Sequence, residues 1–211
     1  MRGKILTRST LSRGFSLIEV LVSIIVLSFG MLGMVGMQAA ALQSNREARL
    51  QSVAYGLSQE LAEMMRGNKD AALLTAGNPY FVDVSASPLQ PATPSYCLNV
   101  GASSPCAGSP LLVKHTAIGS GQMTEWLARV DAELPGARVV VCLDSTPFET
   151  ASGLPQWACT VPASGGAPYI KIGWTQGSTN RGATGANALI RVNDTGARPA
   201  LVFPVIAGST S

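Results

Sequence analysis

Charged residues are scarce in this sequence, where Asp, Glu, Lys and Arg make up only 13% of the chain. There are 15 Lys and Arg against 12 Asp and Glu, and the first fourteen positions hold four of the basic residues and no acid. The rest of the chain is therefore near neutral. A near-neutral domain lacks the extended basic surface of a nucleic-acid-binding protein, so no nucleic-acid partner is expected.

Histidine is almost absent, since His115 is the only one. None of the four cysteines forms a C-x-x-C pair, and there is no dense acidic loop. These absences argue against a zinc site and a calcium site. The motifs G-x-S-x-G, H-E-x-x-H and a phosphate-binding glycine loop are also missing. We therefore expect no catalytic residue, metal or cofactor, and we expect His115 to be a surface or strand residue in an extended segment.

A long apolar run from Phe15 to Met37 dominates the N-terminal part, and Glu19 is its only charged residue. The run is long enough to cross a bilayer as a helix, in which the backbone satisfies its own hydrogen bonds. The basic residues before it, Arg2 to Arg13, predict that this flank stays in the cytoplasm. The remainder of the chain would then be exported.

Helical periodicity continues beyond the apolar run. Apolar residues recur at spacings of three and four at Leu50, Val53, Leu57, Leu61 and Met64. One helix is therefore predicted over about residues 15–66, with Gly67-Asn68 as its stop and a length of roughly 75–80 Å. Residues 15–37 would span the membrane and residues 38–67 would form an amphipathic continuation. A cleaved signal peptide is the alternative, because residues 37–41 include three alanines, but its apolar core is usually shorter and lacks a carboxylate.

Glu19 is costly in this position, because a carboxylate at the centre of a lipid-facing helix costs about 2.5–3.5 kcal/mol on insertion scales. It either reaches water at the membrane interface or has a partner.

The segment Arg13-Gly14-Phe15-Ser16-Leu17-Ile18-Glu19-Val20-Leu21 resembles the type IV prepilin signature. The resemblance implies that residues 1–14 are a leader, that prepilin peptidase cuts after Gly14, that Phe15 becomes the N-methylated terminus, and that Glu19 is the carboxylate used in assembly.

The cysteines all lie beyond the apolar run, in the part expected to be exported, where disulfides form readily. Three pairings of Cys97, Cys106, Cys142 and Cys159 are possible. We favour Cys97–Cys106 and Cys142–Cys159, because each of these bonds closes a short loop that contains Pro or Gly.

The remaining residues, 68–211, are predicted to form a globular α+β head. Residues 68–110 are interpreted as a connecting loop, with an extended piece at 80–84. A short helix is expected over 122–134, with Trp126 in the core rather than on a binding surface. Strands are expected over residues 137–143, 169–175, 187–192 and 200–206. Pro204 indicates that the last of these is an edge strand or ends early. The expected architecture is a long helix packed on an antiparallel sheet.

The head is similar to minor pilins of the PilV type, the type IV pilus modification proteins. The similarity rests on Trp126-Leu127, on the turn from Glu133 to Ala137, and on the strands containing Val139–Val141 and Ile172–Trp174. Ala137 departs from it, because a second glycine is expected there. The similarity implies a minor pilin, with a minor pseudopilin of a type II secretion system or a tip subunit for adhesion or DNA uptake as alternatives.

The expected partners of such a subunit are other minor and major pilins, prepilin peptidase, the inner-membrane pilus assembly machinery and membrane lipid. Its expected location is the bacterial inner membrane, as a single-pass protein with a periplasmic head, followed by the pilus or cell surface.

Overall fold

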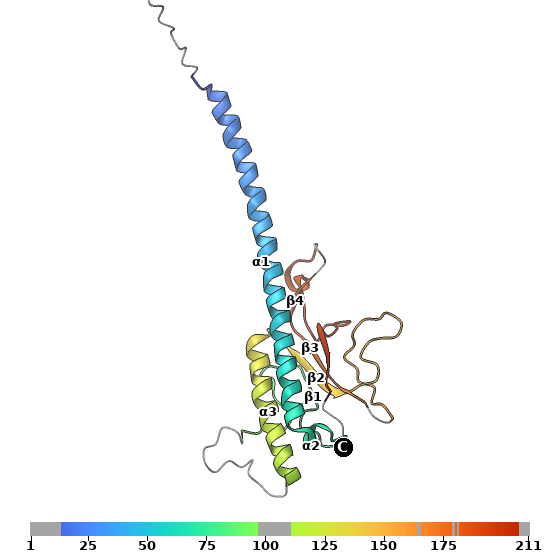
Figure 1. Ribbon diagram of the computed structural model, residues 1–211. Helices are drawn as coiled ribbons and strands as arrows, with labels where there is room; N and C mark the ends of the chain where they lie inside the picture. Colours follow the sequence, from blue (N-terminus) through green and yellow to red (C-terminus); the bar gives the residue numbers. More distant parts are fainter. Residues whose placement is uncertain (1–13, 97–110, 164–165, 179, 181, 207–211) are drawn as a thin grey trace, which may run out of the picture. The chain divides into compact units, whose positions relative to one another are not determined.

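The computed structural model describes residues 14–96, 111–163, 166–178, 180 and 182–206. The described chain forms two compact units, one up to Arg46 and one from Glu47 onward. The first unit is the N-terminal part of helix α1, which runs over Leu17–Gly67 in all. The second unit, called the head below, contains the rest of α1 and the other helices and strands of the described residues (Figure 1).

The head has a four-stranded antiparallel sheet in the order β1-β2-β3-β6. Its strands are β1 (Val82–Val84), β2 (Arg138–Leu143), β3 (Pro168–Gly173) and β6 (Leu201–Pro204). In the register of the two central strands, Val139 lies opposite Ile172 and Val141 opposite Ile170. The architecture is therefore α+β, as predicted, and β6 is an edge strand, in keeping with Pro204, which has no N–H to donate to a further strand.

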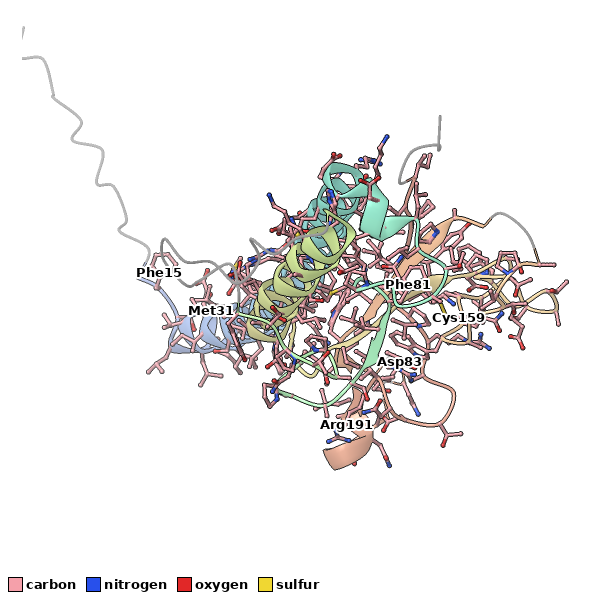
Figure 2. The ribbon with its side chains drawn as sticks, turned by 90° about the horizontal axis from the view of Figure 1, so that it is seen from below. Phe15, Met31, Phe81, Asp83, Cys159 and Arg191 are labelled. Atoms are coloured by element: carbon pink, nitrogen blue, oxygen red, sulfur yellow. A yellow bond between two sulfur atoms is a disulfide. The ribbon has the colours of Figure 1, made fainter. Side chains whose placement is uncertain are left out.

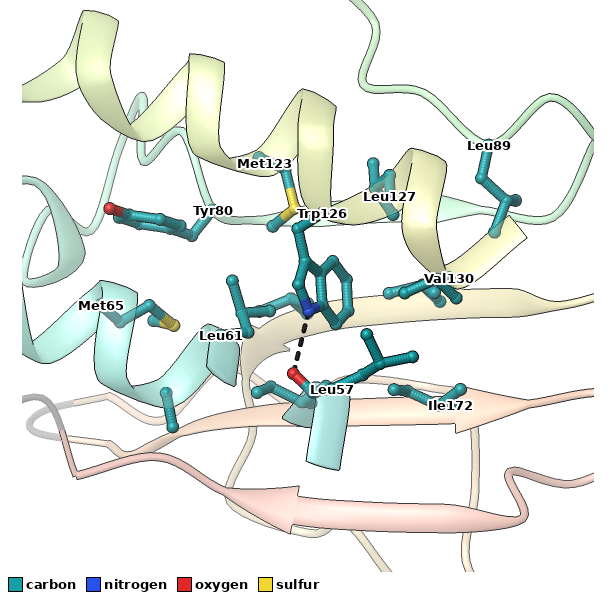
Figure 3. Close-up of a cluster of buried hydrophobic side chains, with 14 of the residues drawn as sticks. Leu57, Leu61, Met65, Tyr80, Leu89, Met123, Trp126, Leu127, Val130 and Ile172 are labelled. Atoms are coloured by element: carbon teal, nitrogen blue, oxygen red, sulfur yellow. Dashed lines mark hydrogen bonds between the residues drawn. The ribbon is translucent and has the colours of Figure 1, made fainter. Parts of the chain in front are cut away.

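One face of the sheet is covered by two helices, the second half of α1 and α3 (Leu111–Glu133), which lie side by side in Figure 1. The predicted stripe of α1 enters this core: Leu57 and Leu61 are buried, and Leu50, Val53 and Met64 pack against the buried cluster. Trp126 of α3 is fully buried, and its indole N–H donates to the Leu57 carbonyl over 2.9 Å (Figure 3). The prediction that Trp126 belongs to the core is confirmed.

The opposite face of the sheet is covered by the loop between β2 and β3. Because side chains alternate along a strand, Val140, Cys142 and Lys171 point away from the helices. The loop returns over them and places Trp157 beside Gly173, where an added Cβ would lie 2.9 Å from the ring. The guanidinium of Arg138 stacks on the same ring at 4.6 Å from its centre. Gly173 is thus required by the close approach of the loop.

Three predictions about local structure are corrected. Residues 68–110 are not only a loop, since the described part contains helix α2 (Lys69–Ala72) and strand β1. Helix α3 begins at Leu111, eleven residues before the expected start. The strand predicted over 187–192 is a 3₁₀ turn, η2 (Gly185–Ala188), followed by the two-residue strand β5 (Leu189–Ile190), which pairs with β4 (Gln176–Gly177).

Candidate functional site

The predicted cleavage position lies in exposed, non-helical backbone. Gly14, Phe15 and Ser16 precede α1 and are exposed. The Ser16 carbonyl accepts the amide N–H groups of Glu19 and Val20, at 3.0 and 3.3 Å, and so receives the first bonds of the helix. The Gly14–Phe15 peptide bond is therefore outside the helical hydrogen-bond ladder. Exposed backbone outside the hydrogen bonds of a helix is accessible to cleavage by a peptidase.

Glu19 lies in the first turn of α1. A carboxylate in this turn interacts favourably with the positive end of the helix dipole. The Glu19 side chain is exposed, and none of the ion pairs among the described residues includes it. Phe15 and Glu19 are four positions apart. A terminal amine on Phe15 and the Glu19 carboxylate would therefore pair either with each other or with groups of another molecule. The structure places Phe15 just before the helix and Glu19 in its first turn, and their roles stay predictions.

The N-terminal part of α1 is apolar on every side. Its most apolar 18-residue window has a mean hydropathy of 2.4, and none of that window is buried. Large side chains remain well exposed throughout, from Phe15 at 83% to Met37 at 72%, and Figure 2 shows Phe15 and Met31 projecting from the chain. An exposed apolar surface of this size indicates a membrane or protein interaction site. By length and composition, this is the helix among the described residues that can cross a membrane.

The cysteine predictions are confirmed where the structure describes them. Cys142 and Cys159 form a disulfide with a Cα–Cα distance of 6.4 Å, and it closes the loop that covers the sheet. Cys97 and Cys106 lie outside the described residues. The sulfurs of Cys142 and Cys159 and a carboxylate oxygen of Asp144 lie within 4.8 Å of one another. This group offers no ligand set for a metal, because both sulfurs are oxidised and Asp144 is already paired with Lys171.

The pairing of Lys171 with Asp144 was not predicted. Both side chains are fully buried, and the Lys171 ammonium donates to Asp144 Oδ2 over 2.5 Å and to the Ala158 carbonyl over 2.6 Å. Asp144 Oδ1 accepts the amides of Thr146 and Thr160. Burial alone would raise the pKa of Asp144, but the bonds from Lys171 and the two amides outweigh it and hold the pKa below its usual value. The pair fixes the loop on the sheet.

His115 lies in helix α3, so the prediction that it lies in an extended segment is wrong. Its Nδ1 lies 2.9 Å from Asn68 Oδ1, and its Nε2 lies 3.5 Å from Asp70 Oδ2. The Asn68 amide nitrogen also donates to the Tyr80 hydroxyl and to the His115 carbonyl. Burial raises the pKa of Tyr80, and the bond from Asn68 partly opposes this shift. These contacts join the end of α1 to α2 and α3.

Comparison with known proteins finds a match in the N-terminal segment. Residues 10–35 match the family model described as the prokaryotic N-terminal methylation motif, which is type IV prepilin-like. No similar curated protein was found. No similar solved structure was found either. The matched residues contain Gly14, Phe15 and Glu19, and the motif indicates a protein of the type IV pilin-like or pseudopilin kind.

Proposed function

We propose that this chain is a minor pilin, a structural subunit that primes or joins a type IV pilus through its N-terminal helix. The observation that carries the proposal is the combination of an exposed cleavage position, an early carboxylate and an unburied apolar helix on one segment. A folded head with its own core lets the helix remain unburied within the monomer. Such a helix is covered by lipid before assembly and by neighbouring subunits afterwards.

The first step of the proposed function is processing. Prepilin peptidase cuts after Gly14 and methylates the new amine on Phe15, so the chain acts as a substrate and not as an enzyme. The single-pass subunit then stays in the inner membrane with its head in the periplasm, before it enters the pilus. Its partners are other minor and major pilins and the assembly machinery.

Glu19 provides the specificity of assembly in this proposal. The mature amine on Phe15 is a positive charge in an apolar setting, and the Glu19 carboxylate is a negative one. Either charge alone is costly to bury, whereas a pair at least partly offsets the cost of desolvation. Docking that brings the Phe15 amine of one subunit to the Glu19 carboxylate of another is therefore favoured over other axial positions.

The experiment replaces Glu19→Gln, which keeps the size of the side chain and removes its charge. We expect membrane insertion and processing to continue while incorporation into filaments falls, because the amine then lacks its counter-charge. Fractionation into membrane and sheared filament, followed by immunoblotting, measures both quantities. Glu47→Gln on the same helix is the matched control and should assemble normally.

Incorporation of Glu19→Gln at the wild-type level would contradict the role of this carboxylate. Recovery of the wild-type chain in a type II secretion filament, and not in a pilus, would instead favour the pseudopilin alternative.

A further inference from the structure

The loop between β2 and β3 is closed at its mouth by hydrogen bonds as well as by the disulfide. The Ser145 amide donates to the Thr160 carbonyl over 2.9 Å, and the Thr146 hydroxyl donates to the Thr160 hydroxyl over 2.8 Å. The Asp144 carboxylate also joins the two sides, because its Oδ1 accepts the amides of Thr146 and Thr160 at 2.9 and 3.0 Å. The mouth of the loop is thus fastened without any covalent bond.

Lys171 adds to this set of contacts from strand β3. Its ammonium donates to Asp144 Oδ2 on one side of the mouth and to the Ala158 carbonyl on the other. The amide of Thr160 is bound by the same carboxylate. The residue before Cys159 and the residue after it are therefore both held by the ion pair. Both charged side chains are fully buried, so water does not compete for these bonds.

The same contacts fix the positions of the two cysteines. Cys142 lies two positions before Asp144, and Cys159 lies between the two residues that the ion pair holds. The two sulfurs are also close to the ion pair itself, since each lies within 4.8 Å of a carboxylate oxygen of Asp144. None of the hydrogen bonds involved requires the disulfide to be present.

We propose that the Lys171–Asp144 pair is a template for oxidation: it holds the two reduced thiols together and directs them to bond with each other. Because Lys171 lies on β3, opposite Val140 of β2, the template is complete only after these two strands have paired. The disulfide therefore forms after the central strands of the head have joined. This role is independent of the proposed function, because it concerns the head alone.

The chemical step is an exchange with an oxidant that is itself a disulfide, such as oxidised glutathione. One cysteine thiolate attacks a sulfur of the oxidant, and the first glutathione thiolate leaves. The second cysteine thiolate attacks the cysteine sulfur of this mixed disulfide, and the second glutathione thiolate leaves. The chain loses two electrons and two protons, and the oxidant becomes two thiols. The template acts on the second attack, because the thiol with the highest effective concentration reacts there.

The test measures the effective molarity of the Cys142–Cys159 pair in the full-length chain. The chain is reduced in urea, refolded in detergent and equilibrated in mixtures of reduced and oxidised glutathione. Alkylation and peptide mass spectrometry then quantify each pairing. We expect Lys171→Met to lower the effective molarity at least about tenfold, the effect of losing one charge-assisted hydrogen bond. Bonds from this pair to Cys97 or Cys106 should increase correspondingly.

Leu61→Ala is the matched control for a general loss of stability. Leu61 is fully buried in the core on the helical face of the sheet, away from the loop. Its truncation should destabilise the head by an amount comparable to that of Lys171→Met. We expect the effective molarity to fall much less in the control. An equal fall in both variants would show that stability alone governs the pairing and would overturn the template.

A second measurement does not need a variant of the ion pair. In a chain with Cys142→Ser and Cys159→Ser, the Thr160 amide should exchange with deuterium at least about tenfold more slowly than in the same chain unfolded in urea. The reason is that Asp144 still accepts this amide when the disulfide is missing. Overlapping peptides in mass spectrometry measure the exchange. A Thr160 amide that exchanges at the unfolded rate would overturn the template, whatever the result for Lys171→Met.

Discussion

Lys171 and Asp144 are buried side by side beneath the disulfide loop, and each balances the charge of the other. A buried ion pair adds little net stability compared with an apolar pair, but losing one partner leaves an uncompensated charge. The fully buried side chains contrast with the exposed pairs of the head, such as Arg198 with Glu149. Removing the basic partner should therefore lower the free energy of unfolding much more in the buried pair than in the exposed pair.

Lys171→Met should destabilise the head by about 3–5 kcal/mol, because it strands the Asp144 carboxylate in the interior. Urea unfolding of the full chain in detergent, followed by tryptophan fluorescence, measures the change. Arg198→Gln is the control, since an exposed pair contributes about 0–1 kcal/mol. Equal effects of the two substitutions would contradict the structural role assigned to Lys171.

The lowered pKa of Asp144 predicts a loss of stability in acid. The folded state binds the Asp144 proton less tightly than the unfolded state does, so this contribution is fully present above the ordinary value of 3.8 and is lost as pH falls through the lower folded value. The stability advantage of the wild type over Asp144→Asn should therefore shrink as pH falls below that value. Unfolding midpoints compared between pH 6 and the acid range measure it, and a constant or growing advantage would exclude the mechanism.

Helix α3 shows at the scale of elements why its length could not be predicted. Its apolar face from Met123 to Val130 is clear in the sequence, but Gly119 and Gly121 interrupt the pattern before it. In the structure an added Cβ at Gly119 would lie 2.6 Å from Pro79 Cγ and 3.2 Å from the Tyr80 ring. Glycine is therefore needed for tertiary packing in the middle of the helix, and this contact outweighs its low helix propensity.

Two glycine substitutions in helices should have opposite effects. Gly119→Ala should destabilise the head, because the methyl group collides with Pro79 and small-to-large changes in packed sites cost about 1–3 kcal/mol. Gly56→Ala in α1 meets nothing within 4 Å and should stabilise it by up to about 1 kcal/mol, through helix propensity alone. Thermal unfolding of both variants checks the sign. A stabilising Gly119→Ala would show that α3 does not pack on Pro79 as described.

The sequence predicts some strands of the sheet better than others. Those central to the sheet were predicted, because alternation places Val139, Val141, Ile170 and Ile172 on the helical face. Strand β1 was recognised only as an extended piece, since three residues give too short a pattern and its pairing with β2 is set by distant residues. The long separation of Asp144 from Lys171 likewise left their ion pair without a sequence signal.

At the scale of the whole molecule, the two units have opposite chemistry. The head buries its apolar residues in a core between helices and sheet, whereas the first unit exposes nearly all of its own. The candidate site could be predicted because it depends on local order along the chain: a basic flank, Gly14, Phe15, Glu19 and an apolar helix. The hollow of the head that is lined by Ala48, Tyr55 and Trp174 could not be predicted, because it joins residues of α1 to residues more than a hundred positions later.

The most direct measurement is the intact mass and N-terminal sequence of the membrane-extracted chain, from cells with and without prepilin peptidase. We expect a chain that begins at N-methylated Phe15 when the peptidase is present and at Met1 when it is absent. A chain that begins near Leu42, or that still begins at Met1 in the presence of the peptidase, would contradict the prepilin interpretation.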